Sequence, residues 1–189
     1  FTGKLGEASV AALAKGVSDL CNVDVNRVFT ASTGVIGQPL PHEKIVAKLG
    51  ELRENQSAEN LSDAARAIMT TDTFPKGSTK TVSIKGKSVK IAGIAKGSGM
   101  IAPDMATMLV YIFTDGQIAQ ADLQALVSKH NAKTFNCITV DSDTSTSDSL
   151  MIAATGRSGV DVTGNADFSD ALHEIMLDLA QQVVRDGEG

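Results

Sequence analysis

Five large apolar residues near the end of the chain recur at helical spacing, and this stripe constrains the fold more than any other feature. Successive members are three or four positions apart, so all of them lie on one side of a helix. The spacing predicts a long amphipathic helix in this part of the chain. The stripe consists of Phe168, Leu172, Ile175, Leu179 and Val183.

The rest of the chain mixes helical periodicity with strand-like alternation. Polar and apolar residues alternate on both sides of Lys85-Gly86-Lys87, which predicts a hairpin. Gly93–Asp104 is rich in glycine and is expected to form a loop. We predict further helices over Glu7–Leu20, Glu43–Glu54, Ser62–Ile68 and Ala119–His130, and strands over Arg27–Ser32, Thr81–Ile84, Ser88–Ile91, Ala106–Phe113 and Ser149–Ala154. The sequence therefore predicts an α/β protein folded as one compact unit.

Composition excludes several classes of function. Hydrophobic residues make up 42% of the chain and charged residues 21%, as is ordinary for a globular protein. The net charge of −5 argues against nucleic acid or an anionic membrane as the main partner. Cys21 and Cys137 are the only cysteines, and their separation is not that of a metal site, so we expect two reduced thiols.

Several short motifs fail on their context. Gly97–Ala102 has the spacing of a dinucleotide-binding loop, but Pro103 follows and no amphipathic helix opens there. Asp141–Ser145 begins like a calcium loop but lacks its glycine and its final glutamate, so a turn of side-chain-to-backbone bonds is expected instead. The three histidines are scattered, and none is near a serine or cysteine in a known nucleophile pattern.

Four blocks, in this order, resemble the bifunctional ornithine acetyltransferase/glutamate N-acetyltransferase family of arginine biosynthesis. They are Ser32–Gly37 (STGVIG), Ala67–Lys76 (AIMTTDTFPK), Lys96–Leu109 (KGSGMIAPDMATML) and Thr139–Asp148 (TVDSDTSTSD). The resemblance covers essentially the whole chain, which corresponds to the middle half of a family member. It implies a layered α/β fold of the ornithine acetyltransferase (DmpA-like) type, with helices flanking sheets and further segments before Phe1 and after Gly189.

The resemblance implies that the chain cuts itself between Ala106 and Thr107 and that Thr107 is the nucleophile. Residues 1–106 would then belong to one chain and residues 107–189 to a second. A threonine hydroxyl needs a base to take its proton, and cleavage exposes an α-amine on the same residue. Its reference pKa of roughly 7.7–8.0 suits a general base near neutral pH. This mechanism requires no histidine.

Other roles follow from the resemblance position by position. Thr33 and Gly34 match the oxyanion hole, whose donors typically contribute about 2.7–4 kcal/mol each to lowering the barrier. Thr70, Lys96, Thr107 and Glu188 match substrate-binding positions. The ammonium of Lys96 suits a substrate carboxylate, and Glu188 suits the cationic end of ornithine.

The implied reaction is ping-pong: Thr107 takes acetyl from N-acetylornithine and passes it to glutamate. The resemblance implies no metal and no cofactor, with acetyl-CoA as an additional donor substrate in some relatives. It also implies that the two cleaved chains stay together, assemble into a heterotetramer and work in the cytoplasm.

Two other functions remain open at this point. A related self-processing amidase or aminopeptidase would pass the acyl group to water instead of an amine. An unprocessed domain without catalytic activity would serve as structure or as a binding module.

Overall fold

The computed structural model describes residues 2–102 and 108–187 of the chain. These residues group into two compact units, Phe1–Asn60 and Leu61–Gly189. The sequence led us to expect one unit. The difference arises because contacts in the first unit join its own short helices, whereas the sheet lies wholly in the second.

The first unit is helical. Its α1 packs against the two short helices α2 and α3, with Gly16 of α1 facing Leu49. The predicted helix over Glu7–Leu20 is confirmed, while the one over Glu43–Glu54 is split into two. Its elements are α1 (Lys4–Cys21), η1 (Val25–Arg27), α2 (His42–Val46), α3 (Leu49–Glu54) and η2 (Ala58–Asn60).

The strand predicted over Arg27–Ser32 does not form. Residues 28–34 have no regular secondary structure, and the side chain of Phe29 is 79% exposed. A strand needs a neighbouring strand for its backbone N–H and C=O groups, and the described part of this unit contains no strand to pair with.

The second unit is built on a four-stranded mixed sheet in the order β1-β2-β3-β4. β1–β2 and β2–β3 are antiparallel, while β3–β4 is parallel. The predicted hairpin is confirmed, and Lys85 and Gly86 at its turn both have positive φ, as a two-residue hairpin turn requires. The strands are β1 (Lys76–Ile84), β2 (Lys87–Lys96), β3 (Leu109–Thr114) and β4 (Ser149–Ala154).

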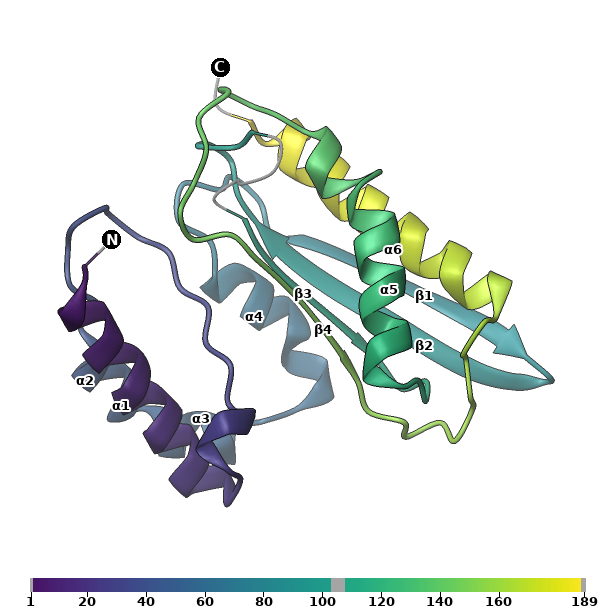
Figure 1. Ribbon diagram of the computed structural model, residues 1–189, viewed down its shortest axis with the longest axis horizontal. Coiled ribbons are helices and arrows are strands. Elements are labelled where there is room, and N and C mark those ends of the chain that lie inside the picture. Colours follow the sequence, from purple (N-terminus) through teal and green to yellow (C-terminus); the bar gives the residue numbers. More distant parts are fainter. Residues whose placement is uncertain (1, 103–107, 188–189) are drawn as a thin grey trace. The chain divides into compact units, whose positions relative to one another are not determined.

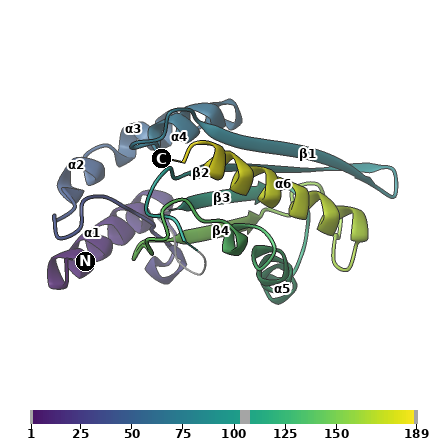
Figure 2. The ribbon, with the colours of Figure 1, turned by 90° about the horizontal axis from the view of Figure 1, so that it is seen from above.

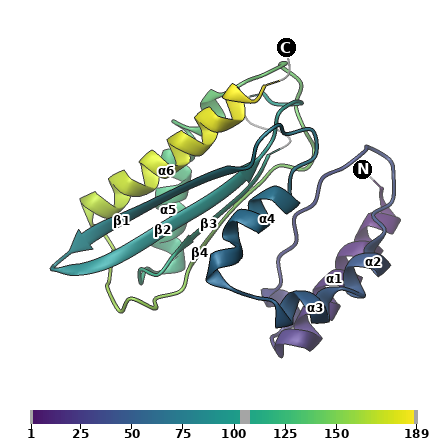
Figure 3. The same cartoon turned by 180° about the vertical axis from the view of Figure 1, so that it is seen from behind.

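Helices cover both faces of this sheet. α4 (Leu61–Ala67) lies on one face, and α5 (Gln120–Asn131) and α6 (Ala166–Arg185) lie on the other (Figures 1 and 3). A short helical turn, η3 (Phe135–Cys137), follows α5. α6 runs along β1 and β2 (Figure 2), and its apolar stripe is buried from Phe168 to Val183. The α/β class predicted from the sequence is therefore confirmed.

The local sequence explains why α6 begins and packs where it does. The side chain of Asn165 accepts a hydrogen bond from the Phe168 N–H and so caps the first turn. Gly93 of β2 lies directly beneath the helix, because a Cβ there would come within 2.9 Å of Leu179 Cδ1. The glycine allows the close approach of sheet and helix that the core needs.

Candidate active site

Three strand ends meet at one end of the sheet, and two of the four sequence blocks supply them. The register pairs Lys96 of β2 with Leu109 of β3, and Leu109 with Ser149 of β4. Backbone bonding continues one residue further. The Met108 C=O accepts from the Ser149 N–H at 3.0 Å, and the Met108 N–H donates to Asp148 Oδ1 at 2.9 Å. The residue that follows Thr107 is therefore fixed between β2 and the start of β4.

Lys96 and Thr70, both predicted to bind substrate, lie next to each other. The Lys96 Nζ donates to Thr70 Oγ1 at 2.9 Å, and its side chain is almost fully buried at the end of β2. Asp72 Oδ2 lies 3.7 Å from the same Nζ. A buried ammonium beside a hydroxyl forms a compact donor pair suited to a carboxylate.

A buried ion network supports this pair from behind. Lys76 Nζ donates to Asp72 Oδ1 at 2.7 Å and to Asp186 Oδ2 at 2.5 Å. Asp186, just beyond α6, also accepts from the N–H and the hydroxyl of Thr73. Together these contacts connect β1, the segment before it and the end of α6.

Asp72 also holds the backbone on both sides of the pair. Its Oδ1 accepts from the Gly97 N–H at 2.6 Å, and its Oδ2 accepts from the Thr70 N–H at 3.1 Å. Burial raises the pKa of Asp72, but these N–H groups and Lys76 outweigh that effect and lower the pKa to about 2. The carboxylate is therefore ionised at neutral pH.

The loop after β2 is tied to the fourth block. The Asp141 carboxylate accepts from the N–H groups of Met100 and Ile101 at 2.5 and 2.9 Å. It also accepts from the Asp143 N–H at 3.1 Å, which confirms the turn of side-chain-to-backbone bonds expected in place of a calcium loop. Backbone N–H donors hold the pKa of Asp141 below its ordinary value.

Asp148 is in a different electrostatic state. Burial raises its pKa to about 6, against the opposing effects of the Met108 N–H and the Lys96 charge. Its Oδ2 is buried and has no hydrogen-bond partner among the described residues. A carboxyl group with such a pKa, bonded to the residue that follows the predicted nucleophile in the sequence, is a candidate for proton transfer.

The remaining predicted site residues lie in the first unit or outside the described residues. Thr33 and Gly34 belong to the first unit, where they precede a turn in which the Gln38 N–H donates to the Val35 C=O at 3.1 Å. Ala106, Thr107 and Glu188 lie outside the described residues. The roles expected for all five therefore stay predictions.

Sequence reasoning passed over Asp72, Lys76, Asp148 and Asp186 as functional residues. The first three stood within two of the quoted blocks, which hold two or three charged residues each among small polar and apolar ones. Those charges were the available signal, because a charge that becomes buried needs a partner. Asp186 gave no comparable signal, since it is 110 positions from Lys76.

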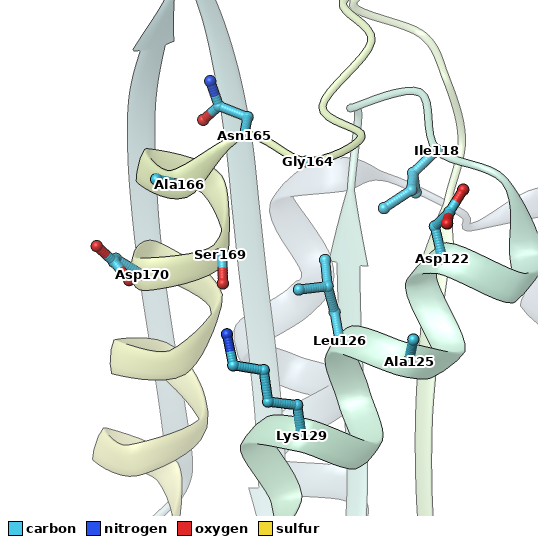
Figure 4. Close-up of a pocket in the computed structure, with 10 residues that line it drawn as sticks. All are labelled: Ile118, Asp122, Ala125, Leu126, Lys129, Gly164, Asn165, Ala166, Ser169 and Asp170. Atoms are coloured by element: carbon cyan, nitrogen blue, oxygen red, sulfur yellow. The ribbon is translucent and has the colours of Figure 1, made fainter.

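A cavity of about 490 Å³ lies between α5 and the start of α6, lined by Leu126, Lys129, Asn165 and Ser169 among others (Figure 4). It contains none of the predicted site residues. Among residues 2–102 and 108–187, no group of three or more His, Cys, Asp and Glu side chains is arranged to hold a metal ion. No described helix has the length and apolar character needed to cross a membrane.

The family model and the curated relatives that match this chain point to the same family. The model of the ArgJ family matches residues 1–189. The arginine biosynthesis bifunctional protein ArgJ of Ruegeria pomeroyi is 68% identical over the whole chain, which covers 46% of that protein. Proteins of the same name from Zymomonas mobilis and Caulobacter vibrioides are 53% and 52% identical, with 47% and 48% of their lengths covered. The chain thus spans about half the length of the curated relatives it matches.

Among solved structures, the PH0078 protein from Pyrococcus horikoshii OT3 matches with a TM-score of 0.38 and 13% identity, over 64% of this chain and 43% of that one. A similarity at this level supports no argument.

Proposed function

Because this chain belongs to the ArgJ family, we propose that it is part of a glutamate N-acetyltransferase of arginine biosynthesis. In this proposal Thr107, freed by self-cleavage after Ala106, takes acetyl from N-acetylornithine and gives it to glutamate. Thr33 and Gly34 stabilise the oxyanion, and Glu188 contacts the ornithine amine. The two cleaved chains remain associated as a heterotetramer in the cytoplasm.

The buried Lys96–Thr70 pair carries the proposal. Both acyl carriers, ornithine and glutamate, have an α-carboxylate that an ammonium–hydroxyl pair can bind. The register aligns Lys96 with Leu109, two residues beyond the proposed nucleophile. A substrate held by its carboxylate at Lys96 therefore lies close to where the β3 chain enters the sheet, which brings reactants together as acyl transfer requires.

The chemistry uses no metal and no organic cofactor, because nucleophile, base and oxyanion donors all come from the chain. The relatives are named bifunctional, and we propose acetyl-CoA as a second acetyl donor of the whole protein.

Intact-mass analysis of the full-length protein tests the proposal. We expect two fragments that separate after Ala106 and, after incubation with N-acetylornithine, one added acetyl group on Thr107. Thr107→Ala removes the hydroxyl that serves both steps, so it should abolish cleavage and acetylation together. A variant that still splits normally would show that Thr107 is not the nucleophile.

Product analysis separates the transferase from a hydrolase. Acetyl transfer should require glutamate as acceptor, whereas a related amidase would release acetate at the same rate without glutamate. A single uncleaved chain that takes no acetyl would indicate a domain without catalytic activity.

A further inference from the structure

In the proposed function, self-cleavage needs a base other than the α-amine of Thr107, whereas acetyl transfer does not. After cleavage, the α-amine of Thr107 can serve as base. Before cleavage, the same nitrogen belongs to the peptide bond with Ala106 and has no basic lone pair, because amide resonance delocalises it. The Thr107 hydroxyl therefore needs another proton acceptor for the first reaction of the chain.

Asp148 has the position for this task. Its Oδ1 is 2.9 Å from the Met108 nitrogen, and covalent geometry places that nitrogen one peptide bond from residue 107 in any conformation. The second hydrogen bond of Met108, to Ser149, fixes the same strand end against β4. One carboxylate oxygen thus anchors the backbone, while the other remains available.

That other oxygen is an unused acceptor. Oδ2 is buried without a hydrogen-bond partner among the described residues. A buried carboxylate oxygen left unpaired costs free energy, so its persistence calls for an explanation in function. A donor brought by the neighbouring chain, such as a hydroxyl, would satisfy it.

We propose that the Asp148 carboxylate accepts the proton of the Thr107 hydroxyl during self-cleavage, before a free α-amine exists. This inference rests on the proposed function, since it takes Thr107 as the nucleophile. The raised pKa of Asp148 supports it, because a carboxylate that binds protons near pH 6 is a stronger base than an ordinary one and is still ionised at neutral pH. Among the charged side chains of the described residues, Lys96 is the one whose field acts on it.

The two histidines of the second unit, His130 and His173, lie against each other. His130 Nε2 lies 3.0 Å from Ser169 Oγ, and the His130 ring lies against that of His173 between α5 and α6. Burial and the neighbouring His173 lower the pKa of His130. These contacts place both rings between α5 and α6, where Nδ1 of His173 has no hydrogen-bond partner among the described residues.

The proposed step balances. Asp148 Oδ2 takes the hydroxyl proton while Thr107 Oγ bonds to the carbonyl carbon of Ala106. The bond between that carbon and the Thr107 nitrogen then breaks, and the proton passes from Asp148 to the departing nitrogen. An ester joins Ala106 to Thr107 Oγ, and water hydrolyses it to give the Ala106 carboxylate and the free hydroxyl. Asp148 ends as it began.

Timed cleavage of newly synthesised full-length chain tests the proposal. Asp148→Asn keeps an acceptor for the Met108 N–H but removes the base, so cleavage should slow by about 10²–10⁴-fold. Asp148→Glu should recover much of the rate. Asp161 gives a matched control, since its carboxylate also accepts a backbone N–H but lies exposed. Asp161→Ala should cleave like the parent chain.

Chemical rescue distinguishes a base from a structural residue. A cavity of about 190 Å³, lined by Met108, Asn131, Phe135 and Asp148 among others, adjoins the carboxylate and has room for formate. Formate should accelerate the cleavage of Asp148→Ala in proportion to its concentration, whereas chloride at equal ionic strength should not. If Asp148→Ala does not fold, as judged by circular dichroism, Asp148→Asn and Asp148→Glu decide the question.

Two results would overturn the proposal. One is cleavage of Asp148→Asn at the parental rate. The other is a folded Asp148→Ala protein whose lost cleavage formate does not restore, together with an Asp148→Glu protein that does not cleave either. Failure of the parent chain to cleave would instead overturn the proposed function, so the two failures can be told apart.

Discussion

The Nζ atom of Lys76 lies 2.5 Å from Oδ2 of Asp186, although 110 positions separate the two residues in the sequence. This contact joins the start of β1 to the end of α6 inside the protein, where neither side chain is more than 1% exposed. A second carboxylate, that of Asp72, shares the same ammonium. The network therefore ties the end of α6 to the start of β1 and to the segment that carries Thr70.

Replacement of Lys76 by methionine should destabilise the protein strongly. Two buried carboxylates would lose their common partner, and removing one member of a buried ion pair typically costs about 3–5 kcal/mol. Lys80 of the same strand gives the control, since its pair with Glu174 is exposed and Lys80→Met should cost about 0–1 kcal/mol. Urea unfolding of both variants measures the difference, and equal losses would contradict the importance of the buried network.

Replacement of Gly93 by alanine should overpack the core. The new Cβ would meet Leu179 Cδ1 at 2.9 Å and Ile112 Cγ1 at 3.0 Å, so these buried side chains would have to shift at a cost of about 1–3 kcal/mol. Gly77, next to it on β1, has its nearest such contact at an ordinary 3.7 Å. Thermal unfolding should therefore place Gly93→Ala well below Gly77→Ala, and similar midpoints would contradict this packing.

Periodicity predicted the second unit well because its elements are defined by local pattern. The α6 stripe, the hairpin and the strand over Ser149–Ala154 each carry their signal within one segment. The glycine-rich run from Gly93 was expected to be a loop, yet its first four residues complete β2. Gly93 allows α6 to lie close to β2. This requirement comes from Leu179, which lies far away in the sequence.

The candidate site was predictable in part. Lys96 and Thr70 were each expected to bind substrate from the resemblance, and they lie in hydrogen-bond contact in the structure. The buried charges were not expected, because pairing between Lys76 and Asp186 depends on tertiary structure alone. The strand over Arg27–Ser32 was predicted from composition and is not formed, since local propensity cannot supply a neighbouring strand.

Lys96→Met should raise the KM for both amino-acid substrates by tenfold or more, because the ammonium that binds their carboxylates is lost. Thr70→Val removes one hydroxyl and should have a smaller effect, about 3–10-fold, as expected for a single hydrogen bond. Lys87 lies at the exposed far end of β2, so Lys87→Met should leave the KM for both substrates unchanged. Steady-state kinetics of the full-length enzyme would contradict the role of Lys96 if its variant matched Lys87→Met.

The pKa of Asp148 makes a prediction about stability that is independent of catalysis. A carboxyl whose pKa is raised from 3.8 to about 6 in the folded state binds its proton more tightly there than in the unfolded chain. Its contribution to stability is thus complete below the unfolded pKa and is lost as pH rises through about 6. At pH 8 the folded protein holds a buried charge that asparagine would not have.

Asp148→Asn should therefore gain stability relative to the parent chain between pH 4 and pH 8, by about 1–2 kcal/mol. The comparison is insensitive to Asp72, whose pKa is lowered to about 2, because both proteins contain it. Urea unfolding at the two pH values measures the change. A difference between variant and parent that is the same at both would show that Asp148 ionises in the folded protein as it does in the unfolded chain. A variant that is more stable at pH 8 but cleaves slowly would show that the chain keeps a destabilising charge at this position for its chemistry.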